Sequence, residues 1–579
     1  MFFFVLRLLL LITSNFGLWE LLRRKTKVNI FFIPSLTVAL QTSVLLLTGI
    51  LNLLFETTMM ITGFGLAYLI FCIWKEKNVR FFKNYVNIGY LFLAVVTVFT
   101  AIALRGSLFQ HYDDFSHWGM VVRRMLSHDR FPNFQDILVF KEYPIGSSIY
   151  IYYFSRLLSA AESVQMTAQA YVMTACLLPL FCFCKKNSVA ALFFVSAFTY
   201  FFFTYNIALS SLLVDTLLPV VSACALLYMY QYCDGSSNGL AFYLAGAYLI
   251  QIVQIKNSGV FFVLIAAAWA VYRAIRVRNC KHYAVLMLMP LISFFLWHSH
   301  CRYVFDDARY SKHAMHPKYY GQIVSQKNAE DFVTIPKNVF LYVIGCRDFW
   351  IMVGLFLIIG LLVYYFVKES LPLYLRLSLF CGTVSLAYQI GLVLMYLFSM
   401  PNYEASILAE IGRYEKSVVI FLVVCLLPVC MKLLECAPSK SAVAYALTAA
   451  FIMIPFVCAF LSTGKISFGL IDSEAAQTES AKERNWLEKQ IKQYDIPSES
   501  SYCVLLPKGD SGLTHYMCIY LFNSDDITVT TIKDADDMNQ IDSRYILVYD
   551  YQNEMIQEWI KQHFPDQVGN SVIVNQSTT

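Results

Sequence analysis

Two adjacent carboxylates, Asp113 and Asp114, are the residues of this chain best suited to catalysis. They lie in the segment HYDDFSHWGMVVRRML (His111–Leu126), between two apolar stretches. A general base needs a carboxylate that is ionised yet poorly solvated, and a helix at a membrane interface supplies that environment. The simpler alternative is that one of the two carboxylates only caps the N-terminus of a helix.

The spacing around the pair favours a catalytic role. If residues 112–126 are helical, a rotation of about 100° per residue puts Asp113, His117 and Arg124 on one face. Asp114 then lies on a neighbouring face beside Trp118. Capping alone would not account for a histidine and an arginine on the face of Asp113. The sequence therefore predicts Asp113 as the base, Asp114 as sharing that role, and His117 and Arg124 as substrate-binding residues.

The same polar loop ends in FKEYPIGSSIYIYYFSRL (Phe140–Leu158). Glu142 and Tyr143 stand directly before a Pro-x-Gly turn. The residues after the turn predict an aromatic, amphipathic helix that lies along the membrane interface. We expect Glu142 and Tyr143 to contact substrate, and the alternative is an ordinary turn into such a helix.

Other polar residues stand at the ends of later apolar runs. Asp215 lies near the start of one run, where it either caps a helix or faces a cavity. Lys256 interrupts another run, where it either holds a phosphate or snorkels to water. Arg413, followed by Tyr414, is expected either to clamp a lipid phosphate or to pair with Glu410 in the preceding turn.

The loop 300–348 is rich in basic and aromatic residues and suits an anionic ligand such as a lipid-linked phosphate. The spacing of two of its histidines could bind a metal, but no carboxylate lies nearby, so no metal site is predicted. The residues in question are Arg302, Tyr303, Arg309, Tyr310, Lys312, His313, His316, Lys318, Tyr319 and Tyr320.

The composition is that of a membrane protein. Of 579 residues, 58% are hydrophobic and 14% are charged, whereas soluble domains carry about 25% charged residues. Recurring apolar stretches predict a mostly α-helical, polytopic membrane protein with about fourteen transmembrane helices. These are expected near 2–20, 32–54, 57–74, 85–105, 165–184, 188–206, 212–231, 239–255, 258–274, 283–299, 349–367, 375–399, 417–434 and 441–462.

Basic clusters set the expected orientation, because Lys and Arg in short loops stay on the cytoplasmic side. The clusters at 23–27, 75–83, 185–186, 273–281 and 432–440 all fall on one side of the predicted topology. The loops 106–164, 300–348 and 400–416 then face outward.

Two domains are predicted. Residues 1–465 form the transmembrane domain, and residues 466–579 form a small extracytoplasmic α/β domain. The expected elements of this second domain are strands at 502–506, 527–531, 545–549 and 571–574, with helices at 473–493 and 552–563.

Several classes of function lack their motifs. The chain contains no Walker loop, dinucleotide fingerprint, HExxH motif or GxSxG elbow, and so no ATP-driven pump is predicted. The net charge of +5 is small and lies mostly in short loops. No nucleic-acid partner is therefore expected.

Taken together, these features resemble the GT-C glycosyltransferases, in particular their protein O-mannosyltransferase-like and aminoarabinose-transferase-like branch. The resemblance rests on Asp113–Asp114 in the first large outer loop, the Tyr143–Gly146 segment, the Arg413–Tyr414 loop and the C-terminal domain. Two departures concern the acceptor. Asp114 stands where the O-mannosyltransferase branch commonly has Glu, and Ile145 stands where relatives often have a second proline.

The resemblance implies an inverting transfer from a polyprenyl-phosphate-linked sugar donor to a cell-envelope glycan or lipid acceptor. The reaction would take place on the outer face of a bacterial cytoplasmic membrane, with the donor tail among the membrane lipids. Asp113, with Asp114, would deprotonate the acceptor, and Lys256 and Arg413 would stabilise the phosphate. No cofactor is required, although a divalent metal on the acidic pair is compatible with the scheme.

Other functions also fit part of the pattern. A flippase or exporter of lipid-linked saccharides predicts charges inside several spans and repeated halves; the sequence has few deep charges and no repeat. A polysaccharide polymerase or ligase would use a large outer loop such as 300–348. A catalytically silent subunit would use its C-terminal domain for binding.

Overall fold

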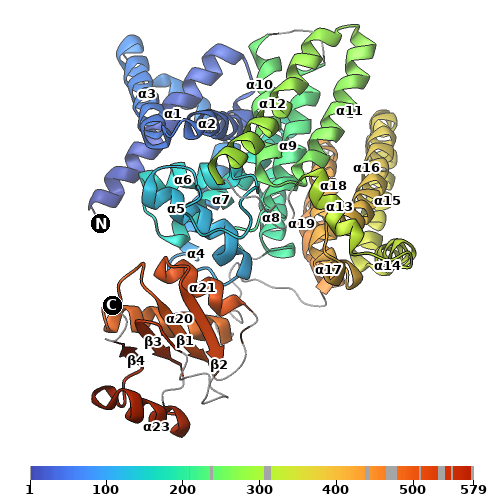
Figure 1. The fold of residues 1–579 in the computed structure, drawn as a ribbon. Coiled ribbons are helices and arrows are strands. Elements are labelled where there is room, and N and C mark those ends of the chain that lie inside the picture. Colours follow the sequence, from blue (N-terminus) through green and yellow to red (C-terminus); the bar gives the residue numbers. More distant parts are fainter. Residues whose placement is uncertain are drawn as a thin grey trace.

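The chain folds into a large helical domain and a small C-terminal α/β domain (Figure 1). The computed structural model describes residues 2–77, 79–207, 209–234, 239–305, 315–436, 442–463, 479–506, 510, 512–531, 541–549 and 552–575. The predicted boundary between the two domains, 465/466, lies outside these residues.

Ten helices of the described part are long and apolar enough to cross a membrane, and the chain is a multi-pass membrane protein. All ten coincide with predicted spans. They are α1 (Phe2–Thr26), η1 with α2 (Ile30–Phe32, Ile33–Ile50), α3 (Leu54–Glu76), α7 with η4 (Glu162–Leu177, Leu178–Phe183), α8 (Ser188–Tyr205), α11 (Gly259–Val277), α12 (Cys280–Phe305), α15 (Arg347–Phe366), η5 with α16 (Lys368–Ser370, Leu371–Phe398) and α18 (Ile411–Cys436).

Apolar helices also occupy the other four predicted positions: α4 (Ile88–Ala103), α9 (Leu217–Tyr232), α10 (Leu240–Ile255) and α19 (Ala442–Thr463). Three of them, α4, α9 and α10, have only 16 residues each. A straight crossing needs about 20 residues. Fourteen crossings therefore stay a prediction.

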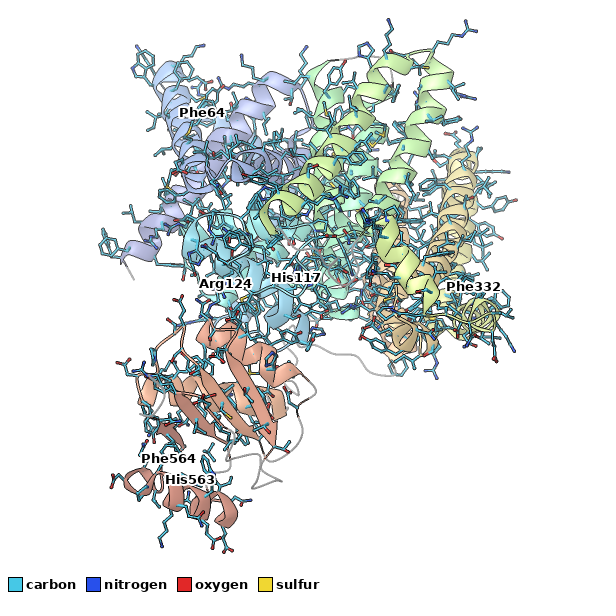
Figure 2. All side chains as sticks on the ribbon, viewed as in Figure 1. Phe64, His117, Arg124, Phe332, His563 and Phe564 are labelled. Atoms are coloured by element: carbon cyan, nitrogen blue, oxygen red, sulfur yellow. The ribbon has the colours of Figure 1, made fainter. Side chains whose placement is uncertain are left out.

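The helices differ in how much of their surface is buried. The apolar windows of α7 and α18 are 83% and 78% buried, whereas those of α11, α15 and α16 are each 22% buried. The outer helices expose large apolar side chains, as Phe64 does on α3 (Figure 2). A hydrophobic outer surface of this kind is stable in lipid, which is as apolar as the side chains themselves.

Shorter helices lie in the predicted outer loops. They are η3 (Asp114–Trp118), α5 (Gly119–His128), α6 (Gly146–Leu157), α13 (Pro317–Ser325), α14 (Asp331–Gly345) and α17 (Asn402–Ser406), and η2 (Arg80–Tyr85) lies between α3 and α4.

Helix α6 was predicted to be amphipathic and to lie along the membrane interface. Nearly all of its residues are buried against α2, α5, α7 and α10. Gly146 explains the close contact with α10: a Cβ at this position would lie 2.7 Å from Cβ of Gln254 and 2.8 Å from its carbonyl carbon. The Pro-x-Gly turn thus starts a helix of the protein core, and its place at a membrane interface stays a prediction.

The C-terminal domain contains α20 (Glu479–Gln493), β1 (Tyr502–Leu506), α21 (Leu513–Phe522), β2 (Ile527–Thr531), β3 (Tyr545–Val548), α23 (Glu554–His563), η7 (Pro565–Gln567) and β4 (Val572–Val574). The strand order is β2-β1-β3-β4, with β1 parallel to both neighbours and β4 antiparallel to β3. All four predicted strands are confirmed. Cys503 and Cys518, the two cysteines of this domain, are buried free thiols.

Helix α21 was not predicted. Its sequence, LTHYMCIYLF, is apolar on most sides because α21 packs both on the sheet and on the helical domain. Helix α23 covers the opposite face of the sheet with Ile556, Trp559 and Ile560. In Figure 1, α21 lies on the side of the sheet that faces α4 and α5.

We predict that Gly146→Ala lowers the thermal stability of the purified protein. The added methyl group would overlap the backbone of α10, and overpacking of this kind costs about 1–3 kcal/mol. Gly382→Ala is the matched control, because a Cβ there meets nothing within 4 Å and alanine favours the helix by about 0.5–1 kcal/mol. Equal melting temperatures for the two variants would contradict the packing of α6 on α10.

Candidate functional site

Four charged residues from distant parts of the chain meet at the end of the helical domain. The Arg413 guanidinium lies 3.1 Å from the Asp113 carboxylate and 3.6 Å from that of Asp215. The Lys256 ammonium lies 2.8 Å from Asp215. We call Asp113, Asp215, Lys256 and Arg413 the charged cluster. Two negative and two positive charges balance, which lets them sit in a poorly hydrated place.

Each member stands where an apolar helix begins or ends. Asp113 precedes η3, Asp215 lies two residues before α9, and Arg413 is in the first turn of α18. Lys256 ends α10 with an extended backbone, φ −160° and ψ 155°. The predicted interruption between the spans 239–255 and 258–274 is therefore a real break, and it delivers the ammonium to Asp215.

Tyr414 lies between the two cations. Its ring centroid is 5.2 Å from the Lys256 ammonium and 5.7 Å from the Arg413 guanidinium. Cation–π attraction adds to the ion pairs where water is scarce. Glu410, the expected local partner of Arg413, lies 3.6 Å from it, but its side chain is 58% exposed. The closer partner, Asp113, is 300 residues away in sequence.

The two adjacent carboxylates have different environments. The Asp113 side chain is 24% exposed and turns toward Arg413. Asp114 is fully buried, and its Oδ1 accepts a 2.9 Å hydrogen bond from the backbone N–H of Leu212. Burial raises the pKa of Asp114 to about 8. Burial thus favours the protonated form of Asp114, which anchors the segment before α9. Its role as a second base stays a prediction.

This division also bears on whether the acidic pair could hold a divalent metal. The Asp113 carboxylate binds Arg413, whereas the Asp114 carboxylate accepts a hydrogen bond from Leu212, so the two groups do not point to one shared site. Among the residues that the structure describes, no group of three His, Cys, Asp or Glu side chains could hold a metal ion.

Asp113, His117 and Arg124, which were predicted on one helix face, each contact different partners. Residues Asp114–Trp118 form a π-helix, in which each N–H bonds to the carbonyl five residues earlier, so the angle of about 100° per residue does not apply. His117 is buried in a ring of aromatic side chains, with centroids 4.6 Å from Trp118, 5.6 Å from Phe140 and 5.3 Å from Tyr143.

Burial lowers the pKa of His117 to about 3. The imidazole is therefore neutral at physiological pH and suits a hydroxyl group better than a phosphate. Neither ring nitrogen has a hydrogen-bond partner within the described part of the chain. A buried polar group without a partner is costly.

Arg124 lies outside the charged cluster. Its nearest carboxylate is Asp136 at 3.7 Å, and Asp136 also binds Arg130 at 2.7 Å. Figure 2 shows His117 and Arg124 in the part of the helical domain next to the C-terminal domain. The prediction that Arg124 binds substrate has no geometric support, because Arg124 fixes the loop after α5.

Tyr143 is one of the aromatic side chains that surround His117, and Glu142 directly precedes it in the chain. Tyr143 stacks on Phe140 with centroids 5.1 Å apart, and the carbonyl of Glu142 accepts a 3.3 Å hydrogen bond from the Trp297 indole. Burial raises the pKa of Glu142, and the charge of Arg302 opposes that shift. Both residues are half-buried.

The described part of the loop 300–348 packs beside the start of α18, where Ile335, Val339 and Val343 of α14 share an apolar cluster with Ile411 and Tyr414. In its described part, α13 and α14 pack on α16, and the Tyr319 hydroxyl donates to the carbonyl of Ser399. His316 caps α13 by accepting the N–H of Lys318. Arg309, Tyr310, Lys312 and His313 lie outside the described residues.

No known family model, curated protein or solved structure matches this chain. The site must therefore be interpreted from its own geometry. Asp215 is the member of the charged cluster to which the sequence assigned no definite role. Its signal was an aspartate directly ahead of an apolar run, although the partner could not be read from the sequence.

We predict that Lys256→Met destabilises the protein more than the double variant Asp215→Asn/Lys256→Met does. Removing one partner of a buried ion pair leaves an uncompensated charge and costs roughly 3–5 kcal/mol, whereas replacing both leaves none. Thermal unfolding of the wild type, both single variants and the double variant measures this coupling. Additive effects would show that Lys256 and Asp215 are independent.

We also predict a pH dependence that originates at Asp114. Its pKa rises from the ordinary value of 3.8 to about 8 on folding. The neutral carboxyl thus favours the folded state fully below pH about 4, and this contribution is lost as the pH rises toward about 8. Asp114→Asn stays neutral throughout. Its melting temperature relative to wild type should therefore rise between pH 5 and 8.

The control for this pH series is Asp525→Asn, because Asp525 is exposed in the C-terminal domain. Its melting temperature relative to wild type should be constant over the same range. A constant difference for Asp114→Asn as well would mean that the Asp114 carboxyl is ionised in the folded protein.

Proposed function

We propose that the chain is an inverting glycosyltransferase that moves a sugar from a polyprenyl-phosphate donor to a cell-envelope glycan or lipid acceptor. One observation carries the proposal. Asp113 is a partly exposed carboxylate held by Arg413, and a second ion pair, Asp215–Lys256, fastens that arginine where apolar helices end. A base and two cations thus meet beside the apolar surface that a lipid tail would contact.

In the proposed reaction Asp113 takes the proton of the acceptor hydroxyl. The hydroxyl oxygen attacks the anomeric carbon as the bond from that carbon to the phosphate oxygen breaks. The electron pair leaves with the polyprenyl phosphate, and the proton stays on Asp113 until solvent removes it. A single displacement of this kind inverts the configuration at the anomeric carbon.

Arg413 and Lys256 would stabilise the departing phosphate. Fixed cations aimed at developing charge in a dry site often supply the largest part of a rate enhancement. Arg413 contacts Asp113 directly, so a bound phosphate competes with Asp113 for the guanidinium. Donor binding would therefore loosen the Asp113–Arg413 pair and leave the carboxylate free to accept a proton.

The remaining residues take different roles in this scheme. The neutral imidazole of His117, with Tyr143 beside it, would bind a sugar hydroxyl and a sugar face. Aromatic rings present flat apolar surfaces that match the C–H face of a pyranose. Asp114 and Arg124 would support the loop, and Glu142 would border the acceptor side.

The location belongs to the same proposal. On this proposal the charged cluster and the C-terminal domain lie on the outer side of a bacterial cytoplasmic membrane, and the positions of the basic clusters support that orientation. A lipid-linked donor suits that side because nucleotide sugars are made in the cytoplasm.

We predict that Asp113→Asn lowers sugar transfer about 10²- to 10⁴-fold, the usual contribution of a general base. Transfer is measured from a radiolabelled polyprenyl-phosphate sugar pool into envelope glycan, in membranes with matched protein levels. Asp525→Asn is the control with a remote carboxylate and should retain full activity.

Wild-type transfer by Asp113→Asn would remove the base from Asp113. A wild-type protein that transfers nothing but moves lipid-linked sugar between leaflets would replace the proposal with that of a flippase.

A further inference from the structure

The C-terminal domain binds the segment that carries Asp113 through helix α21, which lies along η3. The Tyr516 ring packs edge-on against Tyr112, the residue before Asp113, with centroids 4.9 Å apart. Tyr520, one turn further along α21, packs on Phe115 at 5.5 Å. A domain that only tethered another protein would not need to cover this segment.

A single carboxylate, that of Glu162, joins the two domains. Glu162 is the first residue of α7 and accepts the backbone N–H of Phe109, four residues before Asp113. It also accepts bonds from two side chains of the C-terminal domain, the Arg484 guanidinium at 2.7 Å and the Tyr520 hydroxyl at 2.9 Å. Glu162 of α7 therefore accepts hydrogen bonds both from the backbone of the loop and from the C-terminal domain.

Arg484 makes several further contacts where the two domains meet. Its side chain is 3% exposed and also binds Glu488 at 3.0 Å. It donates to the carbonyl of Phe109, and its guanidinium lies 5.4 Å from the ring centroid of Phe115. Arg484 thus holds the peptide at Phe109 from the carbonyl side, while Glu162 holds it from the N–H side.

In a second, weaker contact the donor belongs to the helical domain and the acceptor to the C-terminal domain. Arg123, on α5, donates a 3.3 Å hydrogen bond to the carbonyl of Leu521 and stacks over the ring of Tyr520 at 4.7 Å. Tyr520 is therefore held between Arg123 and Glu162. The 109–118 segment is fixed at both ends of its contact with α21, and Asp113 lies within that segment.

We infer that Arg484 and Tyr520 are positioning residues for the reaction at Asp113. The C-terminal domain holds residues 109–118 in the conformation in which Asp113 faces Arg413. The inference rests on the proposed function for its kinetic consequence, but not for its structural one. The physical reason is that only three residues separate Phe109, which the clamp holds, from Asp113, so loss of the clamp frees Asp113 to move.

The test uses the full-length protein and three variants. Arg484→Met removes the guanidinium, Tyr520→Phe removes only the hydroxyl that donates to Glu162, and Lys489→Ala is the control. Lys489 is exposed on the same helix as Arg484. Tyr520→Phe keeps the packed ring, so it stays informative if Arg484→Met fails to fold.

The first measurement is hydrogen–deuterium exchange of the backbone amides 109–118. Exchange should rise in Arg484→Met and, by a smaller amount, in Tyr520→Phe, while strands β1 and β3 keep wild-type exchange. Lys489→Ala should match wild type everywhere. Unchanged exchange at 109–118 in both Arg484→Met and Tyr520→Phe overturns the inference. A uniform rise of exchange over the whole C-terminal domain also overturns it.

The second measurement is the single-turnover rate constant of sugar transfer, which does not depend on the fraction of active molecules. It should fall about 10- to 100-fold in Arg484→Met, as expected when a reacting group is displaced by about 1 Å. A wild-type rate despite raised exchange would also overturn the positioning role. If wild-type protein transfers no sugar, the proposed function fails, and the exchange result alone decides whether the contact at Glu162 orders the segment.

Discussion

The ion-pair chain Asp113–Arg413–Asp215–Lys256 is the interaction on which the rest of the site depends. Charges at the end of an apolar bundle are costly unless they are paired. Here the paired charges come from different segments, so the pairing also fixes the start of α9, the end of α10 and the start of α18 relative to one another. Asp113 is the most exposed of the four side chains, at 24%.

The pairing separates two neighbours that look equivalent in the sequence. Asp113 and Asp114 are consecutive carboxylates, yet Asp113 turns toward Arg413 and Asp114 is buried in the core. Burial favours the neutral form of Asp114, which accepts a hydrogen bond from Leu212. One residue of difference in position thus gives one carboxylate a charged partner and buries the other.

The sequence was sufficient for features that depend on local composition. Apolar length located the ten described membrane helices, and short apolar or β-branched runs located all four strands, because lipid and sheet burial act on each segment separately. The break at Lys256 was also visible, since polar residues interrupt an apolar run there.

What the sequence could not predict depends on distant partners. The partners of His117 and Arg124 were not predicted, and nothing in the sequence DFSHW predicts the π-helix at Asp114–Trp118. The pair of Arg413 with Glu410, three residues away, was a stated alternative and lies at 3.6 Å, whereas the closer partner Asp113, 300 residues away, leaves no local signal. Helix α21 was not predicted for a related reason: it is apolar both on the side that faces the sheet and on the side that faces the helical domain.

The contact between Glu162 and Arg484 has a consequence for the synthesis of the protein. Its partner Arg484 is 322 residues further along the chain, which a ribosome needs roughly 16–64 s to add at 5–20 residues per second. During that interval the acidic segment is already inserted but lacks the clamp that completes it. A nascent or truncated chain that includes Arg413 but not Arg484 would therefore carry every residue of the charged cluster and still lack the clamp on Phe109.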